Sequence, residues 1–388
     1  MDDATRQFIE EHLHEDVHDL ALRKTPARVD KTLALCQIEA RQHLASKVPS
    51  WSGNPDLLFP PHLSIEQCSS ETTARYKANL MHGNSLVDLT GGLGIDCYFI
   101  SRQFQQAVYV EQSSDLCALA QHNFEVLRQP IAVCHATAEA YLGTCPSVDA
   151  FFLDPARRDQ HGRKVVSISD CTPDVVALQD LLLQKSRRVM VKLSPMLDIA
   201  KALTELRHVK EVHVVAVANE CKELLFIMEP DFEGQPSCAC VNLNTQQPTV
   251  TFTWGTPKPS KAGVDGLSKY LYEPNAAIMK AGCFGVLEER FQVQPLHPNS
   301  HLFTSDRLVG DFPGRIFEVE GWAPYNKRVK QALLQGVDKA SIAVRNFPLS
   351  VADLRKSLKI NDGDTIYLFA TTLINNEKIL IKTMNFFS

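Results

Sequence analysis

The sequence predicts an α/β protein: a parallel sheet with a reversed last strand, preceded by a mainly helical region and followed by a smaller α+β region. Between residues 86 and 193, short strand-like runs alternate with helical segments, a pattern typical of strands joined by crossover helices. Only residues 218–223 separate the next two runs. A parallel return needs a dozen or more residues, so these two strands are expected to form an antiparallel hairpin.

The order of elements follows from the apolar pattern along the chain. Residues 1–80 show leucine and isoleucine spacings that fit helices loosely. The strands expected in the sheet are residues 86–89, 107–111, 131–135, 150–154, 189–193, 212–217 and 224–229. Residues 230–260 are rich in Pro, Gln, Asn and Thr, with one strand-like run at 249–254, and suggest a boundary. Beyond it we expect a helix over 276–289 capped by Asn275, a strand over 341–344, a helix over 351–358 and strands over 365–371 and 378–382.

Composition limits the class of protein. Of the 388 residues, 44% are hydrophobic and 22% charged, which allows a sizeable core and rules out general disorder. The net charge of −5 excludes a uniformly basic coat. However, residues 321–388 alone carry +5, which suggests a separate module with an anionic partner, although a solvated face would look the same.

The chain shows no membrane or secretory signature. No apolar run reaches the roughly 20 residues that span a bilayer, and the acidic N-terminal segment lacks an apolar signal core. Eleven cysteines, an odd number, are typical of reduced thiols, so we expect a cytoplasmic protein. No CxxC pairs repeat, so no metal is expected.

A glycine-rich turn, VDLTGGLGID at residues 87–96, ends the first strand and opens a helix. Glycines at 91, 92 and 94 let the backbone turn sharply and approach a ligand closely. The helix N-terminus supplies free N–H groups, which favour an anionic ligand group. Such turns are common after strands, but this one follows the first strand of the α/β series.

Two carboxylates accompany this turn. Asp88 can meet a ligand ammonium but would repel a pyrophosphate, and GGLG lacks the GxGxxG spacing. Both points argue against a dinucleotide and hence against a nicotinamide-dependent oxidoreductase. Glu111 ends the second strand, 23 residues after Asp88, where a carboxylate can accept both hydroxyls of a ribose. A surface acid at a strand end would explain Glu111 equally well.

DLTGGLGID resembles the first motif of class I S-adenosylmethionine-dependent methyltransferases, and VYVEQ at 108–112 resembles their acidic second-strand motif. The resemblance implies a Rossmann-like, seven-stranded methyltransferase sheet with a reversed last strand and S-adenosylmethionine as the cofactor. Residues 134–139 occupy the place where relatives contact adenine, often through an Asp that is Thr137 in this chain. The cofactor-binding residues implied are Asp88, Thr90, Gly91, Gly92, Gly94, Glu111, Gln112, Thr137 and Ala138.

The fourth strand ends in FFLDPARR at 151–158, which resembles the (Asp/Asn)-Pro-Pro-aromatic motif of amino methyltransferases. The resemblance implies that the Asp154 side chain and the Pro155 carbonyl accept hydrogen bonds from the target nitrogen. Ala156 and Arg157 replace the second proline and the aromatic residue of that motif. A turn after a buried strand would also explain the aspartate and proline.

Other blocks, at 63–70, 73–77, 270–278 and 321–382, resemble a group of bacterial methyltransferases with a ferredoxin-like and THUMP-like C-terminal region. The implied domains are a helical region at 1–80, the methyltransferase domain at 81–230, a ferredoxin-like domain at 235–320 and a THUMP-like domain at 321–388. By analogy with THUMP modules, this implies RNA as the partner. The residues expected to bind nucleic acid are Arg157, Arg158, Lys327, Arg328 and Arg345.

These observations predict an S-adenosylmethionine-dependent methyltransferase that methylates a base nitrogen in RNA, either tRNA or rRNA. The alternative is an RNA-binding protein with a non-catalytic methyltransferase fold, which the altered fourth-strand motif suggests. A protein acceptor stays open, because no residue names the acceptor. The sequence predicts no oligomeric state.

Overall fold

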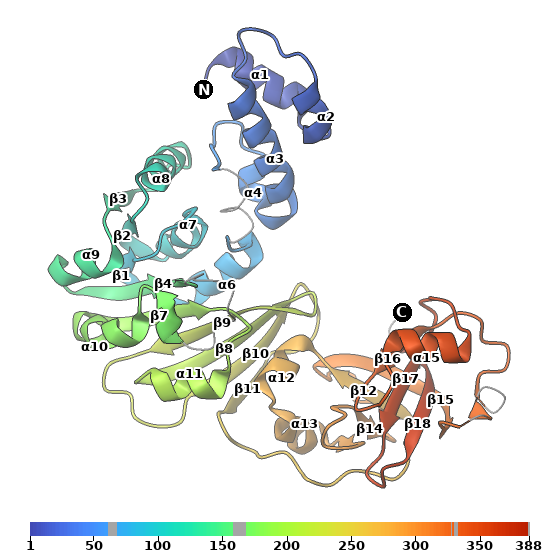
Figure 1. Cartoon of the computed structure of the whole chain (residues 1–388). Helices are drawn as coiled ribbons and strands as arrows, with labels where there is room; N and C mark the ends of the chain where they lie inside the picture. Colours follow the sequence, from blue (N-terminus) through green and yellow to red (C-terminus); the bar gives the residue numbers. More distant parts are fainter. Residues whose placement is uncertain (61–67, 158–167, 327, 330–332, 387–388) are drawn as a thin grey trace. The chain divides into compact units, whose positions relative to one another are not determined.

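The computed structural model describes the chain except residues 61–67, 158–167, 327, 330–332 and 387–388 (Figure 1). The chain folds into two compact units. The first comprises Met1–Glu211 and Leu224–Gly234, and the second comprises Val212–Glu223 and Gln235–Ser388. Within the described ranges, no helix is both long and apolar enough to cross a lipid bilayer.

The N-terminal region is helical, as the sequence predicts. Its helices are α1 (Asp3–His12), α2 (Val17–Leu22), α3 (Lys31–Lys47), α4 (Pro49–Ser52) and α6 (Glu71–Leu80). Four of them begin at a side chain that accepts hydrogen bonds from first-turn backbone N–H groups, and these caps are Asp2, Asp16, Asp30 and Ser70. A small core that contains Ile9, Leu20, Ala34 and Ile38 packs the first three helices together.

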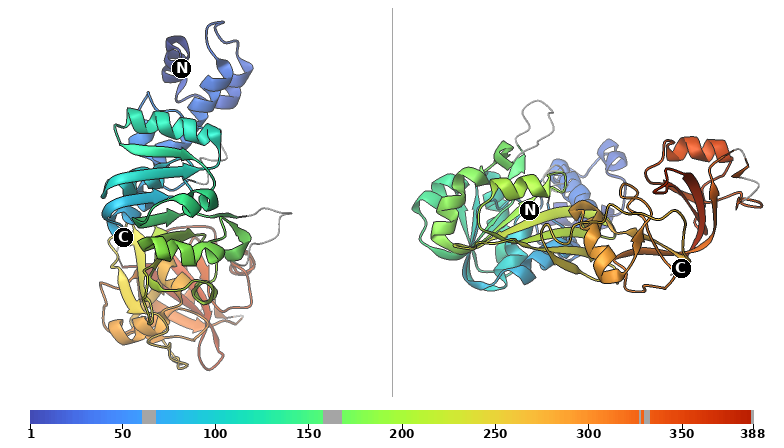
Figure 2. Two further views of the ribbon diagram at one scale, coloured as in Figure 1. Left: turned by 90° about the vertical axis from the view of Figure 1, so that its left-hand side faces the viewer. Right: turned by 90° about the horizontal axis from the view of Figure 1, so that it is seen from below.

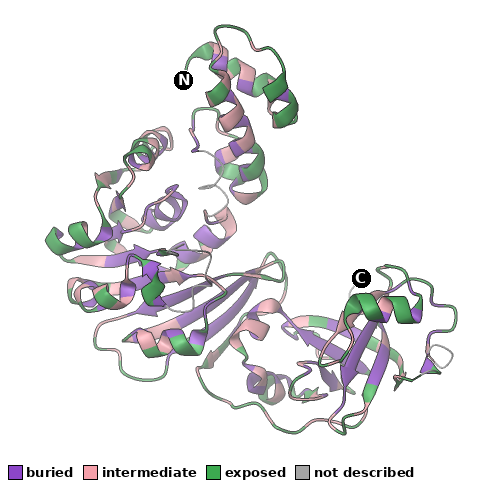
Figure 3. Cartoon of the chain, in the orientation of Figure 1, coloured by how far each residue is buried: buried purple, intermediate pink, exposed green. Residues whose placement is uncertain are grey.

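Five parallel strands form one side of the large sheet. They are β1 (Gly83–Asp88), β2 (Phe104–Glu111), β3 (Ile131–His135), β4 (Val148–Leu153) and β7 (Ser186–Leu193), paired in the order β7-β4-β1-β2-β3, with β3 as the edge strand of the sheet. The connecting helices are α7 (Ile95–Ser101), α8 (Ser114–Val126), α9 (Ala138–Thr144) and α10 (Val175–Lys185), and α11 (Ile199–Glu205) follows β7. The carboxyl-terminal parts of β1 and β4 are buried, whereas most residues of the edge strand β3 are not (Figure 3). Because parallel strands end at one edge, the segments after them share that edge.

The predicted reversed strand is confirmed. β9 (Glu220–Met228) runs antiparallel to β7, and β8 (Val209–Val217) is its other neighbour in the sheet. Only Ala218 and Asn219 join β8 to β9, with φ angles of 48° and 67°. Two consecutive positive φ angles are typical of the tight turn that matches the twist of a hairpin.

The large sheet has two more strands than the seven predicted. Its order is β11-β10-β8-β9-β7-β4-β1-β2-β3, where β10 (Ser237–Leu243) and β11 (Val250–Thr253) form an antiparallel pair. The sequence analysis missed β10 because SCACVNL has small and polar residues rather than alternating large apolar ones. Tertiary burial overrides that weak local signal, and β10 covers the otherwise unpaired edge of β8.

A second sheet occupies residues 270–385. Its order is β13 (Gln294–Pro295), β14 (Phe303–Ser305), β12 (Tyr270–Pro274), β15 (Gly314–Pro324), β18 (Lys378–Asn385), β17 (Ile366–Thr372) and β16 (Ser341–Val344). β16 and β17 are parallel and are joined through α15 (Val351–Leu358). Figures 1 and 2 show α15 lying over this end of the sheet, where Leu354 and Leu358 share a core with Ile342 and Leu368. The helix predicted over 351–358 and the strand predicted over 341–344 have the same bounds here.

The single helix predicted over 276–289 is wrong. The structure has α12 (Ala276–Ala281) and α13 (Phe284–Phe291), separated at Gly282. Gly282 has a φ of 65°, a left-handed conformation that ends a helix. The start was predicted correctly, because Asn275 Oδ1 accepts a hydrogen bond from Ile278 N at 3.0 Å.

Candidate active site

The glycine turn after β1 is packed against β2. A Cβ added to Gly91 would lie 2.1 Å from the Tyr109 ring, so only glycine fits there without rearrangement. The Tyr109 hydroxyl donates to the Gly92 carbonyl oxygen at 2.6 Å. Gly92 and Gly94 have φ angles of 53° and 83°, and Gly94 is the N-cap of α7. The turn is therefore a tightly held backbone segment at the carboxyl edge of the sheet.

Asp88, the last residue of β1, is fully buried. Its Oδ1 accepts from Thr90 N at 2.9 Å, but its Oδ2 is buried without a hydrogen-bond partner in the described part of the chain. Burial raises the pKa of Asp88 well above its ordinary value, the Thr90 N–H opposes this, and the carboxylates of Asp96, Asp154 and Glu111 add to it. A buried acceptor without a partner is costly, and a ligand ammonium would satisfy it.

Glu111 is held at the end of β2 by two backbone groups. Its Oε2 accepts from Gly92 N at 3.0 Å, and its Oε1 accepts from Ser113 N at 2.9 Å. These bonds orient the carboxylate and leave further lone pairs that can accept ribose hydroxyls. The neighbouring Gln112 is exposed, and its carbonyl oxygen lies 3.0 Å from His135 Nε2.

The end of β3 lies beside Glu111, since Ala136 N donates to the Glu111 carbonyl oxygen at 3.1 Å. Thr137 is exposed and caps α9, its Oγ1 accepting from Ala140 N at 3.2 Å. Ala138 is buried. The structure thus assigns the Thr137 hydroxyl a capping contact, while the expected contact with adenine stays a prediction.

The fourth-strand motif meets the glycine turn. Asp154 N donates to Thr90 Oγ1 at 2.6 Å, although the two residues are 64 positions apart. The Asp154 carboxylate pairs with Lys192 Nζ at 2.5 Å, and Pro155 is buried. The altered positions that follow form β5 (Ala156–Arg157), which pairs antiparallel with β6 (Cys171–Thr172) next to the short helix η1 (Ile168–Asp170).

From the sequence, residues 192–195 at the end of the fifth strand are candidates for the rim of this site, and an ordinary capping turn would explain them equally well. Lys192, at the end of β7, contacts both Asp154 and Ser69. Asp96 in α7 and Lys77 in α6 extend the same group of charges. The signal for Lys192 is its place near the end of the fifth predicted strand, whereas the sequence assigned no role to Asp96 or Lys77.

The residues predicted to bind nucleic acid are described only in part. Arg158 and Lys327 lie outside the described residues, and only the backbone of Arg157 is described, in β5. Arg328 is exposed. Arg345 pairs with the buried Glu273 at 2.8 Å, so part of its guanidinium is already used within the second unit.

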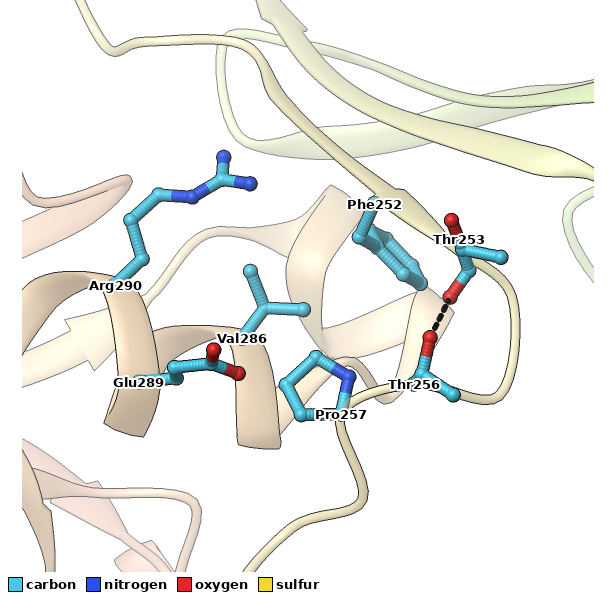
Figure 4. Close-up of a pocket in the computed structure, with 7 residues that line it drawn as sticks. All are labelled: Phe252, Thr253, Thr256, Pro257, Val286, Glu289 and Arg290. Carbon is cyan, nitrogen blue, oxygen red and sulfur yellow. Dashed lines mark hydrogen bonds between the residues drawn. The ribbon is translucent and has the colours of Figure 1, made fainter.

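One described pocket lies in the second unit, and none of its lining residues is a predicted site residue. Its volume is about 660 Å³. It is lined by Phe252, Thr253, Thr256, Pro257, Val286, Glu289 and Arg290 (Figure 4). Thr256 Oγ1 donates to the Thr253 carbonyl oxygen at 3.2 Å across its rim.

The carboxyl edge therefore combines a glycine turn, an unsatisfied buried acid and an oriented strand-end acid, on a sheet with a reversed last strand. This combination defines the class I methyltransferase fold. Two family models match the chain: a ferredoxin-like domain over residues 270–313 and a THUMP domain-like family over residues 314–383.

Known proteins give the same assignment. A candidate methyltransferase from Porphyromonas gingivalis W83 is 33% identical in its crystal structure, with a TM-score of 0.87 over 99% of this chain and 98% of that chain. Uncharacterised S-adenosylmethionine-dependent methyltransferases from two Mycobacterium tuberculosis strains are 22% identical, over 80% of this chain and 83% of theirs. The chain belongs to the family of S-adenosylmethionine-dependent methyltransferases that includes the P. gingivalis protein.

Proposed function

We propose that the carboxyl edge of the sheet binds S-adenosylmethionine through the residues that the sequence predicted. The bound cofactor would supply an electrophilic methyl group on a cationic sulfur. Asp88 Oδ2 would accept from its ammonium, and Glu111 would accept from the ribose hydroxyls. The buried, unpartnered Asp88 oxygen supports this assignment most strongly, because an ammonium is the chemical group that it lacks.

We further propose that the acceptor is a base nitrogen in RNA. The Asp154 carboxylate and the Pro155 carbonyl would accept hydrogen bonds from the acceptor amino group and orient it in line with the methyl group. The observation that carries this proposal is the 2.6 Å hydrogen bond from Asp154 N to Thr90 Oγ1, which holds the motif at the glycine turn. Orientation of this kind supplies much of the rate when the methyl donor is already reactive.

RNA is favoured over a protein acceptor by the second unit. The THUMP-like match covers 314–383, and residues 321–388 carry a net charge of +5 in a chain whose total is −5. A local basic region attracts a phosphate backbone by a sequence-independent electrostatic term. The cytoplasmic location that the sequence predicts agrees with an RNA acceptor.

The test compares modified nucleosides by mass spectrometry in tRNA and rRNA from cells with and without the gene. RNA from the deletion strain is then incubated with the protein and tritiated S-adenosylmethionine. We expect one methylated nucleoside to be missing in the deletion strain and to be restored in vitro by the wild-type protein. Asp154→Ala should reduce the rate by about 10²-fold or more. Identical nucleosides in both strains would refute an RNA acceptor.

The same assay decides the alternative of a non-catalytic RNA-binding protein. Its basis is the replacement of the second proline and the aromatic residue by Ala156 and Arg157, which form strand β5. If tritium enters RNA equally slowly with wild-type protein and with Asp154→Ala, while both bind RNA, the fourth-strand motif is not catalytic.

A further inference from the structure

A buried chain of alternating charges runs through the first unit to Asp154. At its inner end lies Lys77 of α6, whose side chain is 0% exposed. The Lys77 ammonium is 3.1 Å from Asp96 Oδ1 and donates to Ser69 Oγ at 3.2 Å. Ser69 Oγ in turn donates to Asp96 Oδ2 at 2.7 Å. These contacts join α6, α7 and the segment before α6.

Lys192 connects this group to the predicted site. Its Nζ lies 3.6 Å from Asp96 Oδ2 and 3.0 Å from Ser69 Oγ, and it contacts Asp154 Oδ2 at 2.5 Å. The side chains become more exposed from Lys77 toward Asp154: that of Lys192 is 12% exposed and that of Asp154 is 37% exposed. The outer carboxylate therefore faces solvent, while the ammonium behind it is anchored inside the protein.

Among the described residues of this charge network, two ammonium groups face two carboxylates. Burying a charge is costly unless it is paired and hydrogen-bonded, so each member depends on its neighbours. Burial raises the pKa of Asp96, but the ammonium groups of Lys77 and Lys192 and the Ser69 hydroxyl outweigh this and hold that pKa below its ordinary value. Asp96 is therefore a charged anchor for Lys192.

We propose that Lys192 is a positioning residue for methyl transfer: anchored by Asp96 and Ser69, it holds Asp154 Oδ2 and thereby presents the other carboxylate oxygen to the acceptor amino group. This inference rests on the proposed role of Asp154 as the acceptor-facing group. Lysine is a compact point charge on a flexible stem, so it needs such an anchor to fix a partner. An unanchored Asp154 would rotate, and a misplacement of about 1 Å can cost roughly 10²-fold in rate.

The kinetic test uses Lys192→Met, Lys192→Arg and a control. With deletion-strain RNA and tritiated S-adenosylmethionine, Lys192→Met should lower kcat at least 10-fold. The Kd for S-adenosylmethionine should change less than 3-fold, because Asp88 and Glu111 are untouched. Lys192→Arg restores a cation and should recover part of kcat. The control is Lys210→Met, which removes an ammonium paired with Glu229 at 2.7 Å and should keep wild-type kcat.

A crystallographic test separates this inference from the proposed function. Structures of wild type and Lys192→Met with S-adenosylhomocysteine should show the Asp154 carboxylate in one orientation in the wild type and in a different one, or several, in the variant. An unchanged Asp154 orientation in Lys192→Met, or an unchanged kcat, would overturn the positioning role. If wild type transfers no methyl group to RNA, the proposed acceptor is wrong, and the Asp154 orientation in the two crystals still decides the role of Lys192.

Discussion

At the scale of single residues, the carboxyl edge is defined by how four acids are partnered. Glu111 accepts from two backbone N–H groups, and Asp96 and Asp154 face lysines. Within the described residues, Asp88 is the one acid of these four with a buried oxygen that has neither a hydrogen-bond partner nor an ammonium group beside it. That difference is the reason to place the cationic part of the ligand at Asp88.

The substitution Asp88→Asn separates binding from folding. It should weaken S-adenosylmethionine binding about 10- to 100-fold, the range expected for a lost charged hydrogen bond, as measured by calorimetry. Because the folded pKa lies above the ordinary 3.8, Asp88 favours the folded state below pH 3.8, and this contribution is lost as pH rises through the folded pKa. The ligand-free variant should therefore be more stable than wild type at neutral pH in urea unfolding. A less stable variant with unchanged affinity would contradict this.

The strand-end acids and Lys192 could be placed at this edge from the sequence, whereas the contacts of Lys192 could not. Asp88, Glu111 and Asp154 lie at the ends of the first, second and fourth predicted strands, and parallel strands bring their ends together. Lys192 is 123 positions from Ser69, and no local pattern links the two. Such pairings depend on how α6 and α7 pack, which single-sequence periodicity does not report.

At the scale of elements, the site depends on short, rigid connections between strands and helices. The turn after β1 fits because a glycine faces the Tyr109 ring, and the turn between β8 and β9 fits because two residues adopt positive φ angles. The succession of strands along the chain and the antiparallel hairpin followed from run lengths and connection lengths. β10 and the break at Gly282 did not, because burial and one glycine conformation decided them.

Replacement of Gly91 tests the packing of the turn. Gly91→Ala places a Cβ 2.1 Å from the Tyr109 ring, so it should destabilise the protein by about 2–3 kcal/mol and abolish cofactor binding. The control is Gly143→Ala in α9, where a Cβ meets nothing within 4 Å and alanine favours the helix by up to about 1 kcal/mol. Urea unfolding and calorimetry measure both. Equal stabilities for the two variants would show that the turn adapts.

At the scale of the whole molecule, the two compact units differ in their charged residues and in the family models that match them. The first holds the carboxyl edge with its acids, and the second holds the ferredoxin-like and THUMP-like matches. This division of labour, with chemistry in one unit and RNA backbone contacts in the other, stays a prediction. The charge of residues 321–388 and the THUMP-like resemblance suggested it, without indicating which basic residues are already paired, as Arg345 is with Glu273.

Charge reversal in the second unit tests that division. Arg328→Glu should weaken RNA binding severalfold and reduce the slope of log K against log salt by about 0.7–0.9, the loss of one phosphate contact. S-adenosylmethionine affinity should be unchanged. Arg187→Glu, which reverses an 89% exposed cation at the start of β7, is the matched control and should bind RNA like wild type. Equal losses in both variants would indicate only a general charge effect.

The most direct measurement is a crystal structure of the protein with S-adenosylhomocysteine. The ligand ammonium should lie within hydrogen-bond distance of Asp88 Oδ2, and its ribose hydroxyls should lie within the same distance of the Glu111 carboxylate. A ligand bound elsewhere, or a carboxyl edge left empty at saturating ligand concentration, would contradict the assignment of this edge as the cofactor site.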